Sequence, residues 1–173
     1  EIAGRALSFA GVALALGLIL FGAFVREARS GEERRREDLA IDAGGGLLIA
    51  GAALLVIDQG GRLPDRLGLM LALRAAAGLA IGATQAGPLS RLLPPAVRRI
   101  LVYAAGLAAA FSLTFVSHAA AGGGVKDVLL DLVHVVAISA WLGGIVGLLW
   151  IALPSARPAE PDDARALGAV VGR

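Results

Sequence analysis

Long apolar segments alternate with short polar segments along the whole chain. Crossing a bilayer core about 30 Å thick takes roughly 20 mostly apolar residues. Five segments approach or exceed that length, namely residues 6–25, 41–57, 67–86, 100–120 and 128–153, and each contains at most one Asp, Glu, Lys or Arg. The pattern predicts an all-α integral membrane protein, a polytopic bundle of about five transmembrane helices in a single domain over residues 1–173.

Composition supports the same class of protein. Hydrophobic residues make up 57% of the chain, and the mean hydropathy is +0.77. There is no cysteine, which excludes disulfides, thiolate metal ligands and cysteine nucleophiles. The net charge of +2 is too small to indicate nucleic-acid binding.

Polar segments separate the predicted spans. Residues 26–38 read REARSGEERRRED and are typical of a solvated loop between helices. A second loop is expected around Pro94 and Pro95, because proline cannot continue a helix. Residues 121–127, AGGGVKD, allow only a tight turn, so the fourth and fifth spans should be antiparallel neighbours.

Basic residues collect on one side of the predicted bundle. With five spans, the segments after the first and third spans share a side with the C-terminal tail. That side holds eleven basic residues: Arg26, Arg29, Arg34, Arg35, Arg36, Arg91, Arg98, Arg99, Arg157, Arg165 and Arg173. The other side holds four: Arg5, Arg62, Arg66 and Lys126. Since cytoplasmic loops are enriched in Lys and Arg, we expect an extracytoplasmic N-terminus and a cytoplasmic C-terminus.

The outer half of the predicted bundle contains side chains that are uncommon in membrane spans. A helix rise of about 1.5 Å per residue places Met70, His118 and Asp131 at a similar depth. The same estimate places Arg74 and His134 about one turn deeper. We expect Arg74 to neutralise a nearby acid, either Asp58 or Asp131.

One face of the predicted fifth span collects five residues at helical spacing: Asp127, Asp131, His134, Ile138 and Trp141. Ionisable groups that face lipid are costly and usually mark a pathway or a site. We therefore expect this face to look into the bundle or into a water-filled vestibule. Asp127, Arg74 and Trp141 are assigned to the same polar pathway.

Imidazole, thioether and carboxylate groups together suit a copper ion, because His binds both oxidation states and Met favours Cu(I). Haem b held between His118 and His134 is the competing use, although a depth offset of roughly 8 Å between them counts against it. Ser117 and His118 are adjacent and so point in different directions on a helix, which makes a poor nucleophile and base pair. We do not expect an enzyme.

Residues 112–147 carry the pattern SLTFVSHAAAGG followed by DLVHVVAISAWLGGIVGLL. This pattern resembles the membrane domain of the copper resistance protein D family, at Ser112, Ser117, His118, Ala119, His134, Trp141, Gly143 and Gly144. The resemblance implies a multi-pass protein of the bacterial cytoplasmic membrane that takes part in copper uptake, sometimes with an extracytoplasmic copper-binding protein or domain. Members of that family usually have about eight spans of about 20 residues each, which implies that this chain is part of a longer protein.

The sequence thus predicts a protein of the lipid bilayer that binds copper at the extracytoplasmic side and passes it inward. His118 would be the outer ligand and His134 the deeper one, with Asp131 orienting an imidazole or attracting the ion and Met70 completing a Cu(I) site. Two alternatives remain open. One is a b-type membrane cytochrome or electron-transfer subunit that uses His118 and His134 as axial ligands, and the other is a non-transporting assembly or scaffold subunit.

Overall fold

The computed structural model describes residues 1–24, 31–61, 63–85, 89–116 and 124–153, and in these ranges it is all-helical, without a strand. The long helices are α1 (Ile2–Phe24), α2 (Gly31–Asp58), α3 (Asp65–Gln85), α5 (Pro95–Thr114) and α7 (Val125–Val146). A short helix, α4 (Leu89–Leu92), precedes α5, and a π-helical turn, η1 (Gly147–Ala152), continues α7. The predicted all-helical class is confirmed for the described residues.

Five helices in the described ranges are long and apolar enough to cross a membrane. The best 18-residue windows have mean hydropathies between 1.5 for α5 and 2.3 for α1. Their lengths agree with the roughly 20 residues that a bilayer core requires. The chain therefore has the structure of a multi-pass membrane protein with five candidate spans.

The charged stretch after α1 differs from the predicted loop. Its second half is helical, because α2 begins at Gly31. Glu32 and Glu33 lie in the first turn, where negative charge stabilises the helix dipole. Arg36 Nε also donates to Glu32 Oε1 at 3.1 Å, an i,i+4 pair of the kind that supports an exposed helix. Glu33 and Glu37 are buried, so this turn of α2 belongs to the packed bundle.

The second predicted loop is also shorter than expected. Pro95 starts α5 instead of ending a helix, since a proline in the first turn lacks only an N–H that would have no partner there. Helix α5 therefore begins five residues before the predicted start of the fourth span at residue 100.

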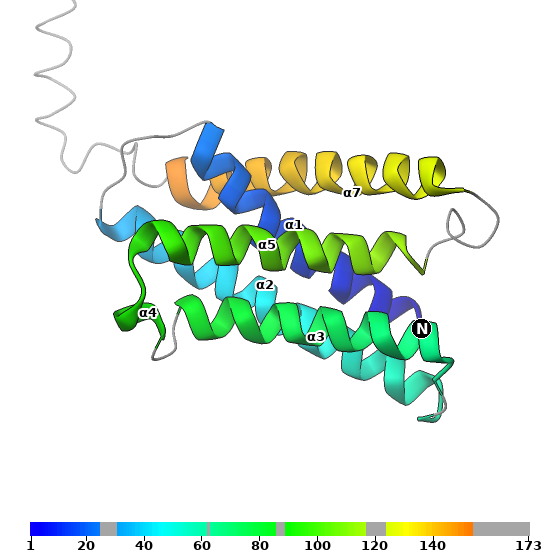
Figure 1. Ribbon diagram of the computed structural model, residues 1–173. Coiled ribbons are helices and arrows are strands. Elements are labelled where there is room, and N and C mark those ends of the chain that lie inside the picture. Colours follow the sequence, from blue (N-terminus) through cyan, green and yellow to red (C-terminus); the bar gives the residue numbers. More distant parts are fainter. Residues whose placement is uncertain (25–30, 62, 86–88, 117–123, 154–173) are drawn as a thin grey trace, which may run out of the picture.

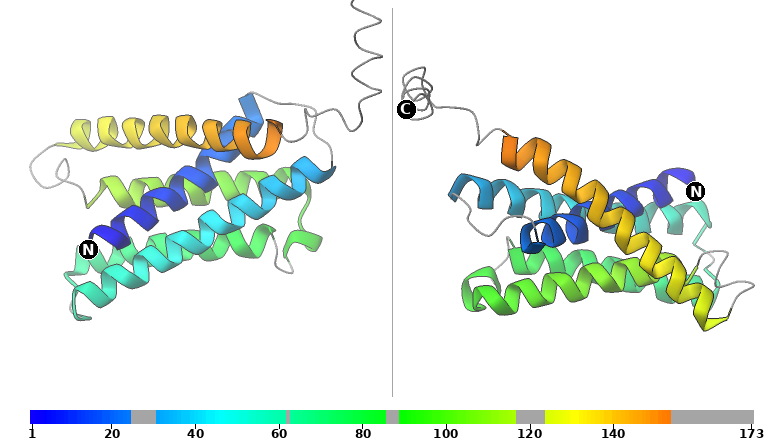
Figure 2. Two further views of the ribbon diagram at one scale, coloured as in Figure 1. Left: turned by 180° about the vertical axis from the view of Figure 1, so that it is seen from behind. Right: turned by 90° about the horizontal axis from the view of Figure 1, so that it is seen from above.

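Helix α1 lies at the centre of the bundle. It packs against α2, α5 and α7, while α3 covers α2 and α5 (Figure 1). Viewed from above, α7 crosses α1 obliquely, and it forms the outer layer of the bundle (Figure 2). Half of the apolar window of α1 is buried, against 22% for α7.

Glycines allow two of these helix pairs to approach closely. A Cβ atom added at Gly143 of α7 would lie 2.3 Å from the carbonyl carbon of Gly17 in α1. A Cβ atom at Gly51 of α2 would lie 2.4 Å from Ser8 Oγ of α1. In lipid no hydrophobic force drives helices together. Small residues let the backbones come into van der Waals contact, and this contact stabilises the helix pair.

Candidate functional site

The orientation of α7 is set by the ridge of residues that packs on α1. Val135, Ser139 and Gly143 are the buried residues of α7 and recur every four positions. Ser139 donates its hydroxyl hydrogen to the carbonyl of Val135 at 2.7 Å, which satisfies it within the helix. This small ridge can approach α1 more closely than the bulkier face beside it.

The face that was expected to look inward is therefore mostly turned outward. Asp127 and His134 are exposed, and Trp141 is 67% exposed, while Asp131 and Ile138 are half-buried. In the described bundle the inward orientation is wrong, because the close contact at Gly143 takes precedence over the burial of the polar face. His134 stands on this outer surface among Leu130, Val133 and Trp141, which are all more than half exposed.

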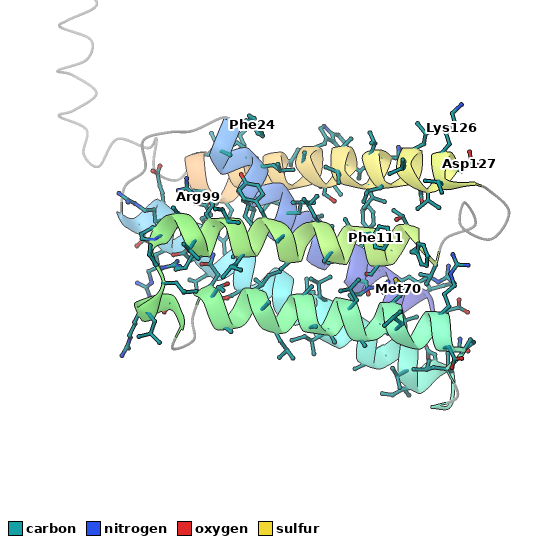
Figure 3. The ribbon with its side chains drawn as sticks, in the orientation of Figure 1. Phe24, Met70, Arg99, Phe111, Lys126 and Asp127 are labelled. Carbon is teal, nitrogen blue, oxygen red and sulfur yellow. The ribbon has the colours of Figure 1, made fainter. Side chains whose placement is uncertain are left out.

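Asp127 has a structural role at the start of α7. Its Oδ2 accepts a hydrogen bond from the backbone N–H of Gly124 at 3.2 Å, which forms half of a capping box. In Figure 3, Lys126 and Asp127 lie at the start of α7, at the same end of the bundle as Met70 and Phe111. The aspartate thus helps to begin the helix whose deeper residues include His134.

Met70 and Arg74 occupy consecutive turns of α3 on its buried side. Met70 is 6% exposed and Arg74 is 1% exposed. His118, which was predicted at the same depth as Met70 and Asp131, lies outside the described residues. Within the described ranges no three His, Asp or Glu side chains are grouped closely enough to hold a metal ion.

Arg74 is held by hydroxyl and carbonyl groups from two other helices. Its Nη1 donates to Ser8 Oγ of α1 at 3.0 Å, and its Nε donates to Ser112 Oγ of α5 at 3.1 Å. Its Nη2 donates to the Ser112 carbonyl at 3.2 Å. The expected pairing with Asp58 or Asp131 is wrong. The hydrogen-bond partners of the guanidinium are serines, and it forms no ion pair with an acid of the described ranges.

Ser8 was not predicted from the sequence as a site residue, and Ser112 was named only as part of the family resemblance. Both serines are fully buried. Each also donates to a carbonyl of its own helix, Ser8 to Gly4 at 2.8 Å and Ser112 to Ala109 at 2.6 Å. A hydroxyl that donates to its own helix keeps its lone pairs for Arg74. The sequence contained one signal for this contact: serines within two apolar spans, and a single arginine within a third span that needs hydrogen-bond acceptors.

A cavity of about 930 Å³ adjoins Arg74 at the end of the bundle that contains the start of α1. Its walls come from all five long helices and are mainly apolar, with Phe9, Leu55, Leu67, Leu113 and Leu142 among them. Among the described residues, the charged side chains that line it are three arginines and one acid: Arg5, Arg66, Arg74 and Glu1. The cavity therefore combines an apolar interior with an excess of positive charge.

Arg66 connects two of the elements around this cavity. Its guanidinium carbon lies 4.4 Å from the ring centroid of Phe115, and its Nη2 donates to the Phe115 carbonyl at 2.8 Å. Together these contacts fix the end of α5 against the start of α3. A second, smaller pocket of about 300 Å³ lies at the opposite end, where Arg98 donates to Gln85 at 2.9 Å and Gln85 donates to Asp38 at 3.4 Å.

The chain matches no protein-family model, no curated protein and no solved structure.

Proposed function

We propose that this protein binds copper at the extracytoplasmic side of a bacterial cytoplasmic membrane and passes the ion inward, as a protein of copper resistance D type. The observation that carries the proposal is the position of His134. Its imidazole is exposed on an apolar helix surface, nine residues and about 13 Å from the start of α7. An ionisable side chain at such a depth is costly in lipid and usually serves an ion or substrate pathway.

The proposed orientation places the start of α1 outside. Within the described residues, the end of the bundle where α2 and α5 begin contains six arginines: Arg34, Arg35, Arg36, Arg91, Arg98 and Arg99. The opposite end contains Arg5, Arg66 and Lys126. The excess of positive charge supports a cytoplasmic location for the first end, and in this orientation α7 begins at the extracytoplasmic side.

His118 and His134 are the proposed copper ligands, on the segment before α7 and within it. Asp131 lies three residues before His134, on the same side of α7, and can orient the imidazole or attract the ion. Met70 is a thioether that would favour Cu(I). Asp131 and His134 both lie on α7, within the residue pattern of 112–147.

We assign the ion path to α7 and the segment before it, and not to the large cavity. Arg5, Arg66 and Arg74 line the cavity against one acid, Glu1. Positive charges raise the energy of a cation most strongly where the surroundings are of low dielectric constant. A copper ion is therefore expected to avoid the neighbourhood of Arg74.

The proposal is tested with the purified chain in liposomes that enclose a copper-sensitive dye. His134→Ala should abolish copper entry, whereas Val133→Ala, which shortens the neighbouring exposed side chain, should leave it unchanged. Normal entry in the His134→Ala protein would refute the proposed path. A visible spectrum of the same preparation tests the cytochrome alternative. A Soret band that is present in wild type and absent in His134→Ala would show that His134 binds haem, and would favour the cytochrome over the copper protein.

A further inference from the structure

Arg74 is a buried cation whose described contacts do not include a negative charge. The residue is 1% exposed, and its three hydrogen bonds end on two serine hydroxyls and one carbonyl. Within the described ranges it has no carboxylate partner. A buried charge is normally paired with an opposite charge, since desolvation is costly and neutral acceptors compensate it only in part.

The guanidinium also has hydrogen-bond donors to spare. Arginine has five N–H groups, and the structure uses one on Nε, one on Nη1 and one on Nη2. One N–H therefore remains on each terminal nitrogen. Arg74 is also among the residues that line the large cavity, and a guanidinium N–H is a strong, charge-assisted donor to a carboxylate oxygen.

The cavity beside Arg74 has the volume and polarity for an amphiphile. Pockets that hold small ligands usually measure about 300–1,000 Å³ and bury most of the ligand in apolar walls, and this cavity has a volume of about 930 Å³. Phe9 of α1, Leu113 of α5 and Leu142 of α7 supply apolar wall. The three arginines exceed the single acid, Glu1, which forms an ion pair with Arg5.

We propose that this cavity binds a single-chain carboxylate amphiphile, with its carboxylate on Arg74 and its apolar body along Phe9, Leu113 and Leu142. Arg74 lies nine residues, or about 13 Å, from the start of α3. A two-chain phospholipid would leave its phosphate near Arg66 at the start of that helix, because its chains begin beside the phosphate. A single-chain acid has its charge at the very end of the molecule, so the carboxylate can reach Arg74.

The test uses the purified full chain in a neutral detergent, with dodecanoate as the probe and methyl dodecanoate as its uncharged match. Native mass spectrometry measures the fraction of protein that carries one bound molecule at each concentration. Wild type should bind dodecanoate at least roughly tenfold more tightly than the ester, as expected for a charge-assisted contact. Arg35→Gln removes an exposed arginine from the opposite end and should keep this preference.

Two variants examine the site itself. Arg74→Gln should reduce the preference for dodecanoate over the ester to about twofold or less, since the charge-assisted contact is lost. Because that change also removes core hydrogen bonds, Ala6→Phe provides a variant that keeps Arg74 and fills part of the cavity from an exposed position of α1. Ala6→Phe should weaken the binding of both molecules.

Several results would overturn the assignment. These are equal binding of the ester and the acid in wild type, an unchanged dodecanoate adduct in Ala6→Phe, or an unchanged preference in folded Arg74→Gln. Displacement of dodecanoate by one molecule of phosphatidylglycerol would also overturn it in favour of a phospholipid site. None of these results depends on copper, so the inference stands or fails separately from the proposed function.

Discussion

Arg74 and Ser112 are joined by two hydrogen bonds across the interface of α3 and α5. Arg74 Nε donates to Ser112 Oγ at 3.1 Å, and Nη2 donates to the Ser112 carbonyl at 3.2 Å. Because the same guanidinium also reaches Ser8 of α1, three helices meet at one side chain. The Arg74 side chain therefore joins α1, α3 and α5 through hydrogen bonds inside the bundle.

Replacing Ser112 with Ala should destabilise the protein. The change removes the acceptor of Arg74 Nε in the core, and a buried charged donor left without its partner costs about 1–3 kcal/mol. Unfolding of the purified protein in detergent measures the loss. Ser139→Ala is the matched control, since Ser139 is also fully buried but donates to a carbonyl of its own helix. Equal stability of the two variants would contradict this role for Ser112.

The sequence pattern predicted the helices and the contact between α5 and α7, but not which helix faces meet. Each predicted span contains the central part of one observed helix, because continuous apolar runs of this length form helices in a membrane-like sequence. The ends differ at Gly31 and Pro95, where charge pairs and a first-turn proline extend the helices. Apolar content does not record these local interactions, so the pattern placed loops there.

The rotation of α7 was the larger error. Polar residues were expected to face the bundle or a water-filled vestibule, but the energy of close packing at Gly17 and Gly143 depends on two helices at once. The periodicity of one helix does not show which of its faces meets its neighbour. The serine partners of Arg74 were missed for the same reason, since Ser8 and Ser112 are 66 and 38 residues away from it in the chain.

Gly143→Ala should disrupt the crossing of α1 and α7. The new Cβ atom would lie 2.3 Å from the carbonyl carbon of Gly17, so the helices must separate. Overpacking of this kind costs about 1–3 kcal/mol or more. Gly144→Ala is the control, because its nearest neighbour would be Phe21 Cδ2 at 4.0 Å, an ordinary contact. Thermal unfolding compares the two, and an equal effect at both positions would argue against the crossing.

The orientation of the bundle can be tested by chemical labelling, because the chain contains no cysteine. Gln59 is exposed after α2, and Arg35 is exposed near its start. In intact cells, a membrane-impermeant maleimide should label Gln59→Cys and leave Arg35→Cys unlabelled, since positive charge favours the cytoplasmic side. Permeabilised cells, in which both should react, provide the control. Labelling of Arg35→Cys alone in intact cells would reverse the topology.

Filling the cavity should leave copper entry intact. The proposed ion path follows α7 and avoids the arginines around the cavity, so Ala6→Phe changes neither His134 nor the face of α7 that contains it. The rate of copper entry into dye-loaded liposomes should stay within about twofold of wild type, because residue 6 does not contact the ion at any step of the proposed path. The same preparation should bind dodecanoate more weakly than wild type, which verifies that the cavity has been narrowed. If copper entry instead falls together with dodecanoate binding, the ion passes beside Arg74, and the anion at that residue becomes part of the copper path by compensating its charge.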